Sequence, residues 1–150
     1  MTTVDFFKSL NYDNGLEVAT SILERFPLQY GTTLGLDGLP QIRPLEFKFE
    51  EQGRLYFDTI AFYQSYKELQ ANPAIQICIG DQETMSYLKV SGRVVFDKDE
   101  RLIKRCLEAS PVLASQFAHQ PELIIPYYLT DVLVQFQSFA PDLPNKEWRL

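Results

Sequence analysis

The segment from residue 30 to residue 96 constrains the fold more than any other part of this chain. It contains five stretches in which apolar side chains alternate with polar ones or run almost continuously, with turn residues between them. A period of two is typical of strands with one buried face. A sixth such stretch follows nearer the C-terminus. The predicted strands are residues 30–36, 41–50, 55–59, 74–80, 85–96 and 127–139.

Short helices are predicted before and between these strands. Apolar residues recur at helical spacing in 3–10, 16–26, 63–71 and 111–120. Thr3 is the expected cap of the first, and a capping sequence at 97–100 begins a further helix that ends near residue 109. Because most strands are joined by hairpins, we expect a mainly β fold, a six-stranded antiparallel barrel with peripheral helices. The chain is interpreted as one domain, with N-terminal helices in 1–27, the barrel in 30–139 and a tail in 140–150.

Charge and composition narrow the class of partners. The net charge is −6 and the basic residues are scattered, whereas nucleic acids and anionic membranes require a concentrated basic face. The two cysteines, Cys78 and Cys106, lack CxxC spacing and are interpreted as buried free thiols. A single histidine, His119, excludes the usual zinc arrangements and marks no catalytic triad. With no signal peptide and no membrane-spanning run, we expect a cytoplasmic protein without nucleic-acid or membrane partners and without a metal.

Arg43 is the most informative single residue. Extending the alternation of strand 41–50 backwards from Phe49, Phe47 and Leu45 places Arg43 on the face that points toward the core. A cation there requires an anion, either an acidic side chain of the protein or a ligand. Pro44 follows directly and cannot donate a ladder hydrogen bond, so this strand is predicted to lie at an edge or a bulge.

A second candidate site lies where strand 55–59 leads into helix 63–71. The start of a helix presents free N–H groups and a positive dipole end, which favour anions. Ser65 and Lys67 in the first turn strengthen that interpretation. An ordinary helix start with no ligand is the alternative.

Four sequence patterns extend these two sites over most of residues 30–139. They are Arg43-Pro44, the sequence Tyr-Phe-Asp-Thr at 56–59, Ser65-x-Lys67-x-Leu69-x-x-Asn72-Pro73, and Val-Ser-Gly-Arg-Val at 90–94. In order and spacing they resemble the pyridoxamine 5'-phosphate oxidase-like family, in particular its small nitroimidazole-resistance-like branch. One position departs from the family pattern, because the usual basic residue before the helix leucine is replaced by Tyr63, Gln64 and Ser65.

The resemblance implies a split barrel that forms a homodimer and binds FMN in the cleft between subunits. By this resemblance, the flavin would lie along the second strand, and its ring edge or ribityl chain would meet the end of the third. The helix start would hold the phosphate, and the fifth strand would reach the flavin from the other subunit. The expected cofactor-binding residues are Arg43, Pro44, Leu45, Thr59, Ile60, Tyr63, Ser65, Lys67, Ser86, Tyr87 and Leu88.

The function implied is an FMN-dependent oxidoreductase acting on a small molecule. No general acid or base stands out, so the chemistry would belong to the flavin. Two alternatives stay open: a non-catalytic split barrel that carries flavin or haem, and a ligand-free barrel that acts as a dimeric interaction module.

Overall fold

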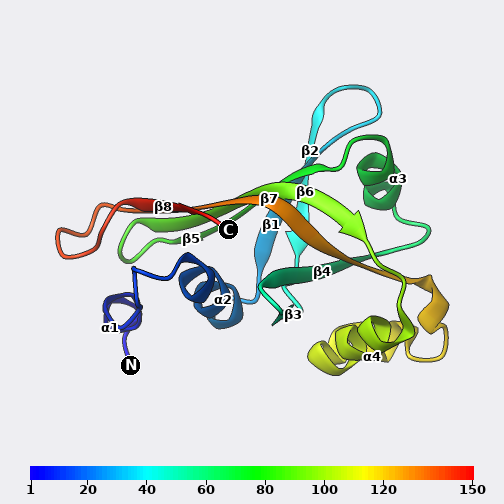
Figure 1. Cartoon of the computed structure of the whole chain (residues 1–150), viewed down its shortest axis with the longest axis horizontal. Helices are drawn as coiled ribbons and strands as arrows, with labels where there is room; N and C mark the ends of the chain where they lie inside the picture. The colour runs from blue at the N-terminus through cyan, green and yellow to red at the C-terminus, as the bar shows by residue number, and fades with distance from the viewer.

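The computed structural model describes residues 1–150 and is dominated by one antiparallel sheet of eight strands (Figure 1). The strand order is β2-β1-β5-β6-β7-β4-β3, and β8 pairs with β7. The strands are β1 Gln29–Leu34, β2 Pro40–Leu45, β3 Phe49–Glu51, β4 Arg54–Ile60, β5 Ala74–Asp81, β6 Ser86–Phe96, β7 Ile124–Ser138 and β8 Lys146–Arg149. The mainly β, antiparallel architecture was expected from the sequence, whereas the predicted number of six strands was wrong.

The first extra strand arises because the predicted strand 41–50 is broken in two. β2 and β3 lie at opposite ends of the strand order, yet only residues 46–48 separate them in the chain. Such a short connection forces the two edges of the sheet close together, so the sheet rolls into an incompletely closed barrel. Pro44 lies on the edge strand β2, opposite Tyr30 of β1, as the sequence predicted.

The buried side chain of Gln29 maintains this break. It has no exposed surface, and its Nε2 donates to the carbonyl oxygens of Leu23 at 2.9 Å and Phe26 at 2.6 Å. Its Oε1 accepts a hydrogen bond of 2.7 Å from the backbone N–H of Phe47. The side-chain amide thus replaces the ladder partner that Phe47 loses where β2 ends.

The second extra strand, β8, lies in the segment predicted as a tail. It pairs with the C-terminal half of β7 and lies at the end of the sheet where the N-terminal helices are (Figure 1). Trp148 of β8 packs directly on Gly15, where an added Cβ would come within 2.4 Å of the indole Cγ. The Trp148 Nε1 also donates to the carbonyl oxygen of Tyr12 at 3.2 Å.

A β-bulge interrupts the pairing at Gly92. The register between β6 and β7 shifts between Ser91 and Arg93, and a Cβ on Gly92 would lie only 3.0 Å from the carbonyl oxygen of Thr130. Opposite this point Asp131 has a φ of 51°. The bulge lets the long strand β7 bend, so that its first half pairs with β4 and its second half with β8.

Five α-helices and one 3-10 turn surround the sheet. They are α1 Thr3–Lys8, α2 Gly15–Arg25, α3 Gln64–Ala71, α4 Glu100–Ala109, α5 Pro111–Phe117 and the 3-10 turn Pro121–Leu123. The cap of α1 is Thr2, whose Oγ1 accepts from the N–H of Asp5, and not Thr3 as predicted. None of the helices has the length and apolar character needed to cross a membrane.

The hydrophobic side chains form two separate cores. The larger fills the barrel and extends to α1 and α2, and the smaller lies between β3–β4 and the α4–α5 pair. Phe47 belongs to the first and Phe49 to the second. The prediction that Phe47 and Phe49 share one inward face was therefore wrong, because the break before β3 changes which face each residue presents.

Candidate functional site

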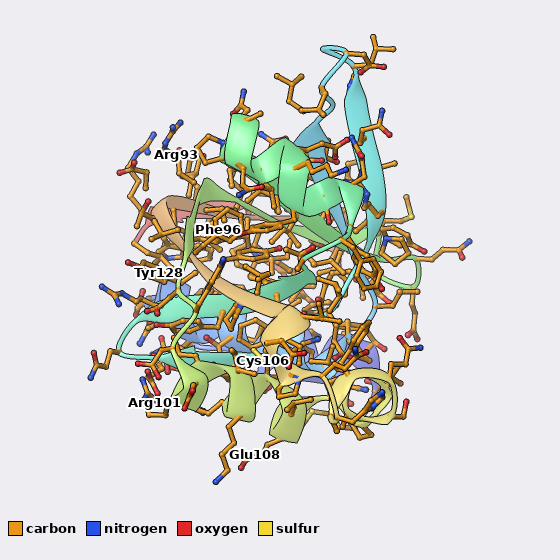
Figure 2. The ribbon with its side chains drawn as sticks, turned by 90° about the vertical axis from the view of Figure 1, so that its right-hand side faces the viewer. Arg93, Phe96, Arg101, Cys106, Glu108 and Tyr128 are labelled. Atoms are coloured by element: carbon orange, nitrogen blue, oxygen red, sulfur yellow. The ribbon has the colours of Figure 1, made fainter.

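A cleft of about 640 Å³ lies at one end of the barrel, within the usual size range of small-molecule sites. Its walls come from β1 and β2, the end of β4, the start of α3, and α5. Figures 1 and 2 show α3 and the α4 region on opposite sides of the end of the barrel. The predicted site residues that line this cleft are Arg43, Pro44, Leu45, Thr59, Ile60, Tyr63 and Ser65.

The four other predicted residues lie elsewhere. Lys67 is exposed on α3 and does not line the cleft. Ser86 and Leu88 are buried in their own subunit, at 3% and 1% exposure, while Tyr87 keeps 37% of its surface exposed. A side-chain contact from this strand to a ligand in a second subunit would therefore come from Tyr87.

The anion that Arg43 requires is Glu68 of α3. The Arg43 Nη2 lies 2.7 Å from Glu68 Oε1, and Nη1 donates to Thr33 Oγ1 at 3.0 Å. The Thr33 hydroxyl in turn donates to Glu68 Oε1 at 2.9 Å. We call Arg43, Thr33 and Glu68 the rim cluster. Glu68 is only 2% exposed, whereas the Arg43 side chain is 31% exposed, so the closed set of contacts sits at the entrance to the cleft.

A second ionic group forms the floor of the cleft. Lys48 lies 2.8 Å from Glu46 Oε1 and 3.6 Å from Asp58 Oδ1, and its side chain is only 5% exposed. We call these three residues the floor cluster. Sequence alternation placed Lys48 and Glu46 on a solvent-exposed face, but the α4–α5 pair covers this part of the barrel, and Ser110 between the two helices lines the same cleft.

Asp58 is the least satisfied group of the floor cluster. Its Oδ2 is buried and has no hydrogen-bond partner. Burial raises the pKa of Asp58 to about 6, and the attraction of Lys48 only partly offsets that effect. Near neutral pH this carboxyl therefore changes its charge with modest changes in pH.

Neither cysteine lines the cleft. Cys106 is a buried residue of α4 beside Asp58 (Figure 2), and desolvation together with the nearby Asp58 charge raises the pKa of its thiol. Cys78 is exposed on β5, which corrects the prediction that both thiols are buried. No group of three or more His, Cys, Asp or Glu side chains is arranged to hold a metal ion.

The start of α3 offers hydroxyl groups but no cation. Thr59 Oγ1 and Ser65 Oγ are 2.8 Å apart and hydrogen-bonded, and the cap residue Tyr63 makes no side-chain capping bond. These residues fit the polar edge or ribityl chain of a flavin, and Leu45 and Ile60 supply apolar wall. For a phosphate, however, the cleft supplies no cation without a protein partner, because Arg43 and Lys48 are both paired.

Sequence reasoning missed Glu68 and Asp58. A signal for Glu68 was present, since residues three and four apart on a helix share a face, and Ser65, Glu68 and Leu69 have this spacing. If Ser65 and Leu69 face the barrel, so does Glu68. Asp58 gave no such signal, because its outward position on β4 is buried only when the α4–α5 pair packs over it.

Comparison with known proteins finds no matching family model and no similar curated protein. Among solved structures, a NimC/NimA family protein from Clostridium acetobutylicum superposes with a TM-score of 0.80 at 22% identity. The match covers 97% of this chain and 94% of that one. This chain has the fold of the pyridoxamine 5'-phosphate oxidase-related proteins. The resemblance inferred from the sequence patterns is confirmed at the level of fold.

Two further neighbours of this oxidase-related fold differ in the ligand they are named for. A pyridoxamine 5'-phosphate oxidase-related, FMN-binding protein from Nostoc punctiforme has a TM-score of 0.66 at 15% identity, covering 95% of this chain and 98% of that one. A haem-binding protein from Mycobacterium smegmatis has a TM-score of 0.70 at 14% identity, covering 91% and 58%. At such identities the fold is shared, while the ligand must be argued from the cleft.

Proposed function

We propose that the cleft binds the planar ring of a flavin and that the protein is a flavin-dependent oxidoreductase acting on a small molecule. The observation that carries this proposal is the convergence of separate predicted segments on one cleft. Arg43 to Leu45, Thr59 and Ile60, and Tyr63 with Ser65 come from three stretches of chain and line the same hollow. An FMN-binding protein shares the fold.

The residues of the cleft suit a flat ring with a polar edge. Leu45 and Ile60 provide apolar surface that excludes water from the ring faces. The edge strand β2 pairs only with β1, so backbone groups on its other side are available to a ligand. Thr59 and Ser65 present hydroxyls that donate or accept hydrogen bonds. When bound, a flavin supplies electron and hydride transfer.

The outer face of the sheet supports association into a homodimer. Tyr30, Leu34 and Ile42 are exposed apolar residues on neighbouring strands β1 and β2, at 44%, 41% and 69% exposure. Tyr30 lies across from Pro44 on one side and Cys78 on the other. An apolar sheet face of this kind supports association with a second copy, which would place a second wall beside the cleft. Static light scattering tests this, and a stable monomer that still binds flavin would contradict it.

Haem is the second candidate ligand, because a haem-binding protein shares the fold. Haem iron in proteins is held by His, Cys, Met or Tyr side chains. The cleft lining contains none of the first three, and of its two tyrosines only Tyr63 is exposed. The geometry therefore favours flavin over haem, and the ligand-free interaction module remains the outcome if neither binds.

The visible absorption spectrum tests the proposal. The purified protein, incubated with riboflavin, FMN or haemin and then desalted, is expected to retain flavin, to release it on denaturation and to show no haem band. Reduction of the retained flavin by NADH or NADPH, followed by reoxidation by a quinone or nitroaromatic acceptor, would support the oxidoreductase. A protein that stays colourless with excess of either flavin would contradict flavin binding.

A further inference from the structure

Arg43 already has an anionic partner inside the protein at the end it presents to the cleft. Both terminal nitrogens of its guanidinium already have partners, Nη2 in Glu68 and Nη1 in Thr33. Thr33 and Glu68 also bind each other, so the three groups form a closed ring of contacts. A carboxylate at 2.7 Å from an arginine nitrogen occupies the kind of position that a phosphate oxygen would otherwise take.

The other cations near the cleft do not compensate. Lys48 is nearly buried between Glu46 and Asp58. Lys67, on the exposed side of α3, does not line the cleft. Around the cleft, two cations therefore face three carboxyl groups, and a dianionic phosphate would add further negative charge to a site without a free cation.

We propose that Glu68 is an internal anion that takes the place of a ligand phosphate at Arg43, so that this cleft selects an unphosphorylated, uncharged planar ring such as riboflavin over FMN. This deepens the proposed function by naming the class of ligand. It also accounts for the departure at positions 63–65, where no basic residue stands before the helix leucine. With Arg43 neutralised inside the protein, no free cation at the entrance attracts a phosphate, and only the N–H groups at the start of α3 remain for it.

The test compares the dissociation constants of riboflavin and FMN, measured by quenching of flavin fluorescence. Wild-type protein is expected to bind FMN no more tightly than riboflavin. Glu68→Gln keeps the shape of the side chain and removes its charge, which frees Arg43 for a charge-assisted hydrogen bond. FMN binding should then tighten by about tenfold or more, while riboflavin binding changes little.

Two further variants make the comparison specific. In the double variant Arg43→Gln/Glu68→Gln both charges are absent, and the ratio of the two constants should return to the wild-type value. Glu108→Gln removes one negative charge at an exposed site on α4, where Figure 2 shows the side chain pointing away from the barrel. This control should leave both constants unchanged.

Each outcome decides a different question. FMN bound about tenfold more tightly than riboflavin by wild-type protein would overturn this inference and support flavin binding. If Glu68→Gln does not fold, a tenfold loss of FMN affinity in the double variant would overturn it, because Arg43 would then be a phosphate ligand. FMN binding by Glu68→Gln alone, with no riboflavin binding by the wild type, would overturn the selection of riboflavin and contradict the proposed function of the wild type. Absence of flavin binding in all four proteins would contradict both.

Discussion

The rim cluster and the floor cluster of the cleft contain similar groups but differ in how completely they are satisfied. In the rim cluster Arg43, Thr33 and Glu68 each bind the other two. In the floor cluster Lys48 bridges two carboxyls, and Asp58 Oδ2 is left without any partner. A closed set of buried contacts fixes geometry, whereas an unsatisfied buried carboxyl is free to titrate.

The difference follows from the elements that carry each cluster. The rim joins β1, β2 and α3, which hold their three side chains at short distances. The floor lies at the break between β2 and β3 and depends on the α4–α5 pair for its cover. The rim cluster therefore holds β1, β2 and α3 together at the entrance, whereas the floor cluster is the part of the cleft whose charge changes with pH.

The largest effect is expected from breaking the floor cluster. Lys48→Met would leave Glu46 and Asp58 close together without their shared cation. Removing one partner of a buried ionic group costs about 3 kcal/mol of unfolding free energy. Urea denaturation near pH 8 measures this, and the loss should shrink below pH 6, where Asp58 becomes neutral. Lys104→Met on α4, where the lysine is 78% exposed, is the matched control. Equal stability of Lys48→Met and the control would contradict the floor cluster as described.

Breaking the rim cluster should have the next largest effect. Arg43→Gln leaves Glu68 buried without its cation, and a buried charge without a partner destabilises the folded state. Because Arg43 itself is partly exposed, we expect the free energy of unfolding to fall by only about 2 kcal/mol. Most of this loss should be recovered in the double variant with Glu68→Gln, where no charge is left unpaired. A double variant that is less stable than Arg43→Gln would show that the two residues do not act as a pair.

Asp58→Asn should stabilise the protein at neutral pH. The pKa of Asp58 is raised from 3.8 to about 6 in the folded state, so wild-type stability declines as pH rises through this interval and stays low above it. The size of this pKa shift limits the gain in unfolding free energy to about 3 kcal/mol. Because the variant also loses the attraction of Lys48, we expect about 1 kcal/mol above pH 6 and little difference below about pH 4. A gain that persists at low pH would contradict this explanation.

The smallest effect is expected at an exposed ionic group that serves for comparison. Glu51 accepts hydrogen bonds from Arg101 and Arg105 of α4, and these lower the pKa of Glu51 to about 2. Because the folded-state pKa is depressed, the contribution of Glu51 to stability is present near neutral pH and is lost as pH falls toward 2. Glu51→Gln should shift the urea midpoint less than Lys48→Met, Arg43→Gln or Asp58→Asn, and high salt should remove most of the shift. A larger shift of the urea midpoint in Glu51→Gln than in Arg43→Gln would contradict the expectation that the buried clusters matter more than this exposed group.

The sequence predicted most of the barrel because its signals are local. Alternation in 85–96 depends only on neighbouring residues, and the strand is confirmed. The break in strand 41–50 was not predictable in the same way. It depends on Gln29, whose side chain replaces a ladder partner across a distance of 18 residues. β8 has no alternating pattern and exists because β7 offers it an edge.

The cleft shows the same difference between local signals, which the sequence reveals, and contacts between distant segments, which it does not. Arg43 was singled out because a cation on a core-facing strand requires an anion, and the anion is an acid of the protein, one of the two possibilities that the sequence left open. Its identity as Glu68 depends on how α3 docks on β1, which no single segment encodes. Asp58 became a buried group only through the packing of the α4–α5 pair.

The most direct test of the central claim is the phosphorus NMR titration of FMN at a protein concentration that saturates the flavin. A free phosphate monoester has its second pKa near 6, and a neighbouring arginine would lower that value. Since Glu68 already neutralises Arg43, the bound phosphate should titrate at or above the pKa of free FMN in the wild type and clearly below it in Glu68→Gln. A pKa lowered by about one or more in the wild type would show that Arg43 binds the phosphate and would contradict the account.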